Sequence, residues 1–260
     1  MGEQEFLSIA EEAARMAGEV LEHWASRFSV REKSRANLVT EADDAAQEVI
    51  HNQIRARYPD HGFLGEEGLD LPNPHSPYRW IIDPLDGTSN YVHRFPYYAV
   101  SIGLERAGEM LIGVIYDPNR NEMFTAVKGQ GAKLNGTPIS PTDVDVLGNA
   151  MAVASLPVAA SVQDPAVARF LKVLPVTQTL QRTGSAALNL AYVGCGRIDL
   201  YWSSSLKPWD MAAGSLIVQE AGGRVSQLDN SPFLVDQPEI LASNGTEIHQ
   251  VFCRLVNSLP

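Results

Sequence analysis

Two patterns of apolar residues, a spacing of three or four positions and short continuous runs, predict the helices and strands of this chain. Near the N-terminus, apolar side chains recur every three or four positions from Phe6 to Trp24, and the opposite face is mostly acidic. This spacing predicts an amphipathic helix packed on a core. Further on, Thr40 and Asp43 resemble a capping box that opens a second helix, which should reach about Tyr58. The chain is therefore expected to begin with two helices.

The middle of the chain has the pattern of strands. Apolar runs at 97–104, 110–116 and 122–127 are separated by turn signals, and such successive hairpins predict an antiparallel sheet. The second half is expected to contain a strand from residue 151, helices at 165–174, 184–194 and 215–220, and a strand at 198–202. A chain of 260 residues can form a single unit, 1–260, whose two halves, about 1–148 and 149–260, share a core.

The stretch 80–91 carries the strongest chemical signal. It opens with an apolar run followed by Asp83 and Asp86, and the turn signals Asp-Pro and Asp-Gly predict that a buried strand ends here. Two carboxylates so close repel each other unless a cation or a proton lies between them, and oxygen ligands suit Mg²⁺, Mn²⁺ or Ca²⁺ rather than zinc. Thr88 and Ser89 can cap a following helix, whose N-terminus would bind an anion. The stretch predicts a hard-metal site beside a phosphate-sized anion site.

Other interpretations of the acidic residues stay open at this point. A surface turn would also use Asp, Pro and Gly. The spacing excludes a calcium EF-hand, which needs acids at alternate positions, and a phosphatase with an aspartyl nucleophile, whose second acid stands two residues after the first. Glu66 and Glu67, between glycines, could be an exposed acidic pair. Asp43 and Asp210 could serve only as helix caps.

Composition narrows the function further. The formal net charge of -11 argues against a nucleic-acid-binding surface but not against an anionic substrate, because a divalent metal supplies positive charge locally. Cys195 and Cys253 are too few for a disulfide scaffold or a cysteine zinc site and fit a reducing cytoplasm. The histidines lack metal-ligand spacing, and no serine lies in a Gly-x-Ser-x-Gly elbow, so neither a zinc enzyme nor a serine hydrolase is expected. We expect neither a secretory signal nor a membrane span.

Three ordered motifs now bring these acids together. Gly65-Glu66-Glu67, the stretch Trp80–Tyr91 and the segment Trp209–Gly214 closely resemble the three signatures of the inositol monophosphatase family. That family belongs to a lithium-sensitive, magnesium-dependent phosphatase superfamily that includes fructose-bisphosphatases. The resemblance covers nearly the whole chain, from Val39 to Gly223. It implies an α+β fold built as a layered α/β/α/β/α sandwich.

The resemblance also implies a metal site with two or three Mg²⁺ ions. Glu66, Asp83 and the carbonyl of Leu85 would hold the first ion. Asp83, Asp86 and Asp210 would hold the second, with Asp83 bridging the two. Glu66 would also share in a third, weaker site. Paired cations can activate water and stabilise a leaving alkoxide together, so the implied reaction is direct attack of water without a covalent phosphoenzyme.

Catalytic and substrate contacts follow from the same resemblance. Thr88 and Asp43 resemble the pair that orients the attacking water, alongside Glu66. The amides of Gly87 and Thr88, with Ser89 at the same helix start, would hold the phosphate. The segment Gly184-Ser185-Ala186 resembles the one that lines the alcohol side of the pocket, to which Asp86 and Asp210 also contribute.

One position departs from the family pattern. Members that prefer inositol phosphates have a Glu seven residues before the Asp of the Trp-Asp motif, where this chain has Ser203. Serine is shorter and neutral, so it does not bind ring hydroxyls as a carboxylate would. A family lysine that precedes the Thr-x-x-Asp segment falls at Lys33.

The expected function is therefore Mg²⁺-dependent hydrolysis of inositol monophosphate to inositol and phosphate, by a cytoplasmic, lithium-sensitive homodimer that takes a small phosphorylated metabolite. Because of Ser203, other esters stay open, namely histidinol phosphate, fructose bisphosphate and nucleotide phosphates. A regulatory binding protein on the same scaffold is the alternative from another class, since some relatives contact transcription machinery.

Overall fold

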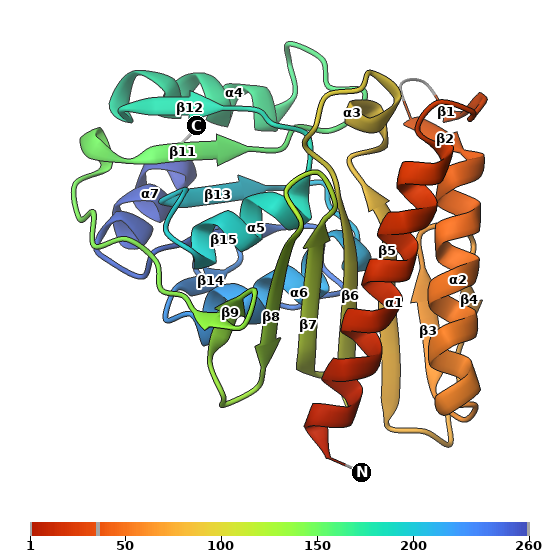
Figure 1. The fold of residues 1–260 in the computed structure, drawn as a ribbon. Helices are drawn as coiled ribbons and strands as arrows, with labels where there is room; N and C mark the ends of the chain where they lie inside the picture. The colour runs from red at the N-terminus through yellow and green to blue at the C-terminus, as the bar shows by residue number, and fades with distance from the viewer. Residues whose placement is uncertain (1, 35–36, 259–260) are drawn as a thin grey trace.

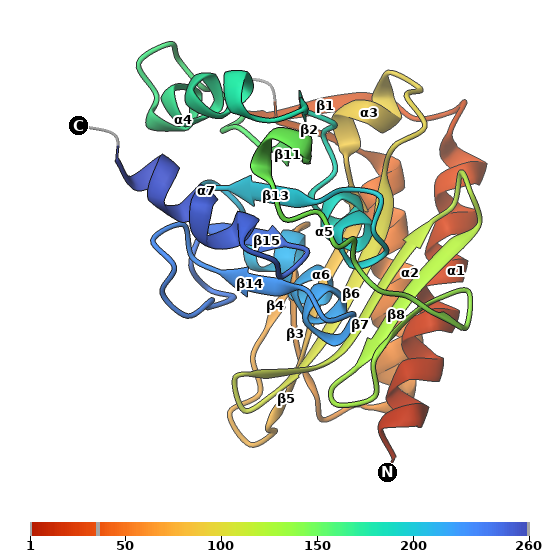
Figure 2. The ribbon, with the colours of Figure 1, turned by 90° about the vertical axis from the view of Figure 1, so that its left-hand side faces the viewer.

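The computed structural model describes residues 2–34 and 37–258, and of Lys33, Ser34 and Asn37 only the backbone. The side chain of Lys33, where the family lysine is expected, lies outside the described residues. Two helices pack on one face of a large sheet, and two further helices separate that sheet from a second one (Figure 1). The chain termini lie at opposite sides of the molecule (Figure 2).

The large sheet has eight strands and is antiparallel except for one pair. In order across the sheet its strands are β10 (Thr137–Pro138), β9 (Ala132–Leu134), β8 (Glu122–Val127), β7 (Glu109–Asp117), β6 (Ala99–Arg106), β5 (Tyr78–Asp86), β3 (Gly62–Gly65) and β4 (Asp70–Leu71). Strands β3 and β5 run parallel. The successive hairpins from β5 to β8 confirm the predicted antiparallel sheet.

Helices α1 (Glu3–Trp24) and α2 (Glu41–Arg57) cover the outer face of this sheet. Alanines at 10, 13, 14 and 17 are fully buried, so α1 lies close to the sheet. The predicted capping box is confirmed, because Thr40 caps α2 and Asp43 bonds back to the Thr40 amide. A hairpin of β1 (Val30–Ser34) and β2 (Asn37–Thr40) joins the two helices.

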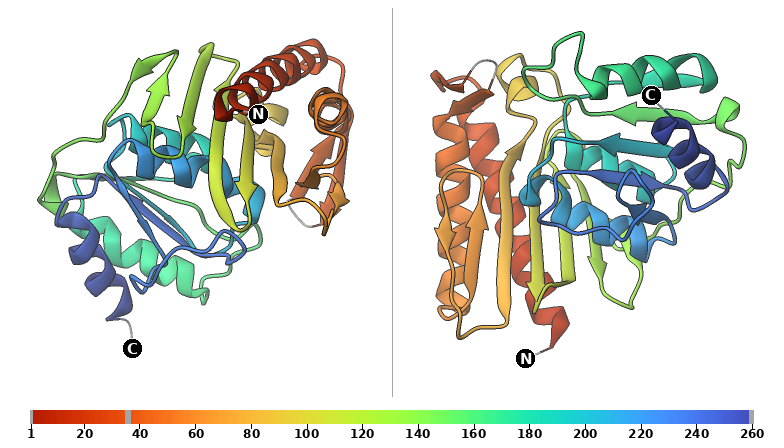
Figure 3. Two further views of the ribbon diagram at one scale, coloured as in Figure 1. Left: turned by 90° about the horizontal axis from the view of Figure 1, so that it is seen from below. Right: turned by 180° about the vertical axis from the view of Figure 1, so that it is seen from behind.

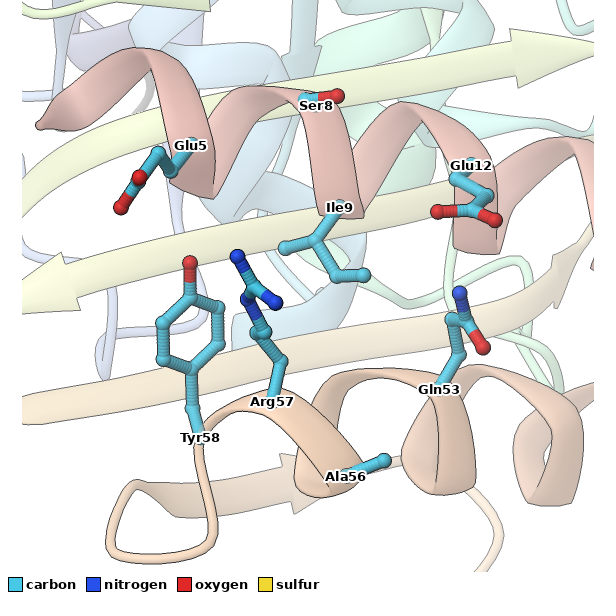
Figure 4. Close-up of a pocket in the computed structure, with 8 residues that line it drawn as sticks. All are labelled: Glu5, Ser8, Ile9, Glu12, Gln53, Ala56, Arg57 and Tyr58. Atoms are coloured by element: carbon cyan, nitrogen blue, oxygen red, sulfur yellow. The ribbon is translucent and has the colours of Figure 1, made fainter. Parts of the chain in front are cut away.

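The pair α1 and α2 leaves a hollow between them, open at the surface (Figure 4). It measures about 470 Å³. Its lining residues come from both helices and from the residue that follows α2: Glu5, Ser8, Ile9, Glu12, Gln53, Ala56, Arg57 and Tyr58.

The second sheet has five strands, of mixed direction. In order they are β12 (Thr179–Gln181), β11 (Met151–Ala154), β13 (Leu200–Ser203), β15 (Ile240–Ser243) and β14 (Arg224–Ser226). Helices α5 (Ala186–Gly194) and α6 (Pro208–Glu220) fill the space between the two sheets. Helices α4 (Pro165–Val173) and α7 (Ile248–Asn257) cover the outer face of the second sheet. Short helical turns occur at α3 (Thr88–Val92), η1 (Leu147–Asn149) and η2 (Leu174–Val176).

The resulting layers confirm the expected α/β/α/β/α sandwich, seen edge-on in Figure 3. The division of the chain into halves near residue 148 stays a prediction. Among the described helices, none combines the length and the apolar character that crossing a bilayer requires.

Helix α6 lies close to the large sheet because two strands present glycine to it. A Cβ atom added at Gly113 on β7 would stand 2.5 Å from the carbonyl oxygen of Ala213. One added at Gly103 on β6 would stand 3.0 Å from the Cβ of Ala212. Any larger residue at either position would push the helix away from the sheet.

Candidate active site

Strand β5 carries the two acids of the central stretch and ends at Asp86, directly before Gly87, so the predicted end of a buried strand at these turn signals is confirmed. The pairing of β5 with β6 slips by one residue, since Asp83 faces Ser101 whereas Asp86 faces Ala99. Residues three apart on a regular strand point to opposite faces of the sheet. The extra residue forms a bulge, which re-aims a side chain, so both carboxylates can turn to the same side. Pro84 has no N–H to lose from the ladder and suits such a position.

A third carboxylate comes from α6. We expected this helix to begin at Ser215, but it begins at Pro208, because proline is well suited to the first turn of a helix. Asp210 thus lies in the first turn, where its carboxylate accepts a hydrogen bond from the Lys207 amide at 2.7 Å. Its capping role is real, and it does not exclude a role in the cavity.

These three carboxylates form one cluster. Ligand oxygens of Asp83, Asp86 and Asp210 all lie within 4.8 Å of one another. Asp83 is 1% exposed and Asp86 7%, whereas Asp210 is half-buried. The helix and the bulged strand therefore bring together like charges that the sequence places more than a hundred residues apart.

Burial makes this cluster electrostatically unfavourable on its own. Burial, and then the negative charges of neighbouring carboxylates, raise the pKa of Asp83 well above its ordinary range. Burial and the charge of Asp86 raise the pKa of Asp210 to about 8. Burial also raises the pKa of Asp86 to about 6, against hydrogen bonds from Ser185 and the Ala187 amide. Such a group needs protons or a cation, and its all-oxygen donors suit Mg²⁺. The residues present therefore fit the expected metal.

Glu66, the residue directly after β3, lies in the same region. Its amide donates to the carbonyl of Ile82 at 3.3 Å, which places it beside β5. Its charge contributes to the raised pKa of Asp83. The next residue is fixed by the side chain of Gln47, which donates to the Glu67 carbonyl and accepts from the Glu67 amide, both at 3.0 Å. The sequence analysis did not predict a role for Gln47. The only feature of the sequence that could have indicated one is that a polar residue stands on the buried face of a helix.

Thr88 lies across from the start of α2. Its hydroxyl donates to Asp43 at 3.1 Å and lies 3.2 Å from the Leu85 carbonyl. We expected Thr88 or Ser89 to cap α3, but the N-cap is Gly87, whose φ of 104° only glycine adopts readily. The Thr88 side chain is therefore available for Asp43 instead of its own helix. Burial raises the pKa of Asp43, and hydrogen bonds from Thr40 and Thr88 oppose the rise.

The segment Gly184-Ser185-Ala186 lies beside Asp86. Ser185 caps α5 through the Leu188 amide, and its hydroxyl donates to Asp86. The Ala187 amide donates to the same carboxylate oxygen at 2.7 Å. This segment thereby fixes the orientation of Asp86.

Asn90 holds the neighbouring turn and was not predicted. Its amide group donates to the carbonyls of Tyr97 at 2.7 Å and Thr183 at 2.8 Å. A Cβ atom on Gly184 would stand 2.9 Å from that amide nitrogen, so glycine is required for the approach. No local pattern could reveal a bond that spans 93 positions.

A cavity of about 500 Å³ opens on these groups. It is lined by Asp86, Ser89, Asn90, Ser155, Leu156, Val158, Arg182, Thr183, Gly184, Ala186, Ser205, Leu206 and Asp210. Ser203 is not among them, because it is fully buried at the end of β13. Ser205 and Leu206 form that part of the wall instead.

The layered fold and the site at the end of β5 are those of a phosphatase. Residues 3–260 match the model of the inositol monophosphatase family, and the chain belongs to that family. It is 42% identical over 260 residues to an inositol-1-monophosphatase of Synechocystis, covering 99% of this chain and 90% of the relative. It is 40% identical over 249 residues to Nus factor SuhB of Pseudomonas aeruginosa, covering 93% and 92%. The structure of an inositol monophosphatase from Anabaena (Nostoc) superimposes with a TM-score of 0.88 at 39% identity, covering 99% and 97%.

Proposed function

We propose that this phosphatase hydrolyses a small phosphate monoester in a Mg²⁺-dependent reaction, with inositol monophosphate giving inositol and phosphate as the first substrate to test. The observation that carries the proposal is the cluster of Asp83, Asp86 and Asp210, whose buried like charges need a cation or protons between them. The similarity to an inositol-1-monophosphatase supports the choice of first substrate.

Two Mg²⁺ ions would be held by five groups of this chain, and a third more weakly. Glu66, Asp83 and the Leu85 carbonyl would hold one ion. Asp83, Asp86 and Asp210 would hold the other, and Glu66 would share in the third. When bound, such ions lower the pKa of a coordinated water and stabilise the charge of the leaving oxygen.

The remaining residues would position water, phosphate and alcohol. The Thr88 hydroxyl donates to Asp43, so its oxygen can accept a proton of the attacking water and hold that water in place. The amides of Gly87 and Thr88, beside Ser89, would bind the phosphate oxygens at the start of α3. The Gly184–Ala186 segment would bound the alcohol, and Asp86 and Asp210 would accept from its hydroxyls.

A phosphate-release assay tests this proposal. The panel contains inositol 1-phosphate, histidinol phosphate, fructose 1,6-bisphosphate and adenosine monophosphate, each with saturating Mg²⁺ and each with a chelator. We expect release only with Mg²⁺, and inhibition by lithium. Equal release with the chelator would exclude the metal-dependent reaction.

A second candidate is a regulatory binding role on the same scaffold. It is favoured by the similarity to a relative named Nus factor SuhB. Protein that binds Mg²⁺ in calorimetry but releases phosphate from no ester would support this role over the enzyme.

We also propose a cytoplasmic homodimer, as the family resemblance and the cysteine content led us to expect. Light scattering coupled to gel filtration would test the dimer. A monomeric mass at micromolar concentration would contradict it.

A further inference from the structure

The cavity beside the acids continues into a second hollow. The first has a volume of about 500 Å³ and the second about 290 Å³. Both are lined by Leu156, Val158 and Arg182, so these three side chains stand where the two spaces meet. The remaining lining of the second hollow is mostly apolar and comes from the segment before α4 and from α4 itself. A molecule with its phosphate at the acids has room to extend past Arg182.

Arg182 is the one cation among the residues that line the two spaces. It is exposed, and within the part of the chain that the structure describes its guanidinium forms no ion pair. Its backbone, in contrast, is well anchored. It follows β12, and the next residue, Thr183, accepts from Asn90 at 2.8 Å and donates to Asn189 at 2.7 Å. The anchored backbone thus holds the Arg182 guanidinium at the cavity, where it is available to bind an anion.

The part of the lining contributed by the segment after β13 lacks a carboxylate that could recognise a neutral polyol. Ser203, at the end of that strand, is fully buried. The lining there consists of Ser205 and Leu206, which bring a small hydroxyl and an apolar surface. The alcohol side of the cavity therefore offers one positive charge and, apart from Asp86 and Asp210 at the acid cluster, no negative one.

We propose that the preferred substrate carries a second anionic group on its alcohol portion, a carboxylate or a second phosphate, and that Arg182 binds it. The guanidinium matches both groups with paired N–H donors, and such charge-assisted bonds are stronger than bonds to neutral hydroxyls. The carbon skeleton between the two anions lies over Leu156 and Val158. This inference rests on the proposed function and narrows the range of substrates. A polyol phosphate would be a preferred substrate only if it carried a second acidic group.

Matched pairs of esters test the inference, because each pair differs only in the second group. Glycerol 3-phosphate is compared with 3-phosphoglycerate, and glucose 1-phosphate with glucuronic acid 1-phosphate. Fructose 1-phosphate is compared with fructose 1,6-bisphosphate, which distinguishes a carboxylate from a phosphate as the second anion. We expect kcat/KM to be about tenfold higher for the acidic member of at least one pair, as one charge-assisted interaction predicts.

Arg182→Gln should lower that ratio of kcat/KM values about tenfold, and Arg182→Lys should lower it less, because a lysine keeps the charge without the paired donors. The matched control is Arg254→Gln, which removes an exposed arginine from α7, on the outer face of the second sheet. It should leave the ratio unchanged. Circular dichroism confirms that each variant is folded.

The outcomes separate the two proposals. Mg²⁺-dependent release with equal kcat/KM within every pair, or a ratio that Arg182→Gln leaves unchanged, overturns the inference but leaves the proposed phosphatase intact. No release from any ester overturns the proposed function and this inference with it. A ratio that falls equally in Arg254→Gln would show an effect of overall charge and would also overturn the role of Arg182.

Discussion

Two hollows in this molecule have nearly the same volume but different chemistry. The cavity at the end of β5 measures about 500 Å³ and the hollow between α1 and α2 about 470 Å³. Each contains two carboxylates and one arginine: Asp86, Asp210 and Arg182 in the first, Glu5, Glu12 and Arg57 in the second.

The difference lies in what holds the charges. In the α1–α2 hollow the two acids stand on exposed helix faces, where water solvates them (Figure 4). In the β5 cavity a strand bulge and a helix start force carboxylates together out of water. Only the second arrangement needs a cation or protons to offset its repulsion. Volume and acid content alone do not identify a site, and burial of like charge does.

The largest test of this contrast removes one carboxylate from the buried acid cluster beside the β5 cavity and one from the α1–α2 hollow. Asp83→Asn should lower phosphate release with saturating Mg²⁺ by at least about a thousandfold, because loss of a bridging metal ligand costs several kcal/mol of transition-state stabilisation. The fold should persist, since the change relieves repulsion. Glu12→Gln is the matched control in the α1–α2 hollow and should retain full activity. Substantial turnover by Asp83→Asn would overturn the assignment.

Next in size is the effect of pH on the metal-free protein. The folded-state pKa values of Asp86, about 6, and Asp210, about 8, lie above the ordinary value of 3.8. The folded protein therefore binds more protons than the unfolded one between about pH 4 and pH 8, and stability should fall as pH rises through that window. The expected loss is on the order of several kcal/mol.

Urea midpoints at pH 5 and pH 8 measure this loss, first with a chelator and then with Mg²⁺. Mg²⁺ at a hundred times its dissociation constant should restore roughly 2.7 kcal/mol at pH 8. In Asp83→Asn this rescue should shrink. A midpoint that is independent of pH without metal would contradict the proposed repulsion.

A smaller effect is expected at Thr88. Thr88→Ala should lower kcat about a hundredfold, in the range of losing a positioned proton acceptor, because the variant keeps the acids but not the hydroxyl bonded to Asp43. Thr88→Ser keeps the hydroxyl and should lose much less. If Ala and Ser lowered kcat equally, the methyl group rather than the hydroxyl would matter.

The smallest effect is expected in the α1–α2 hollow. The Tyr58 side chain is 3% exposed, and among the described residues its hydroxyl has no hydrogen-bond partner of ordinary geometry. Tyr58→Phe should therefore change stability by no more than about 1 kcal/mol, or a few degrees in Tm, with phosphate release unchanged. Clear destabilisation would show that the hydroxyl does bind a group in this hollow.

Features set by near neighbours could be predicted from the sequence. The capping box of Thr40 and Asp43, the apolar face of α1 and the hairpins after β5 all depend on residues a few positions apart. The acids of the cluster were also found, because three motifs resemble a known family. The start of α6 could also have been predicted, since proline is common in the first turn of a helix, but we predicted a start at residue 215 instead of Pro208.

Features set by distant partners could not be predicted. The bulge in β5 depends on how β6 pairs with it. The bonds of Gln47 and Asn90 join segments that only the fold brings together. The burial of Ser203 depends on the layers around β13, so a residue expected to touch substrate lies inside the wall.

The glycines beneath α6 have a consequence for the choice of ion. Asp210 is carried by α6, whereas Asp83 and Asp86 belong to β5, next to β6 in the sheet. Gly103 and Gly113 therefore set the gap between the two sources of oxygen ligands. Mg²⁺ demands oxygen ligands at about 2.0–2.1 Å in near-ideal geometry, whereas Ca²⁺ accepts about 2.3–2.6 Å in flexible geometry, so we expect a wider gap to weaken Mg²⁺ binding first. Two residues that touch no ligand are thus expected to influence which ion the proposed site prefers.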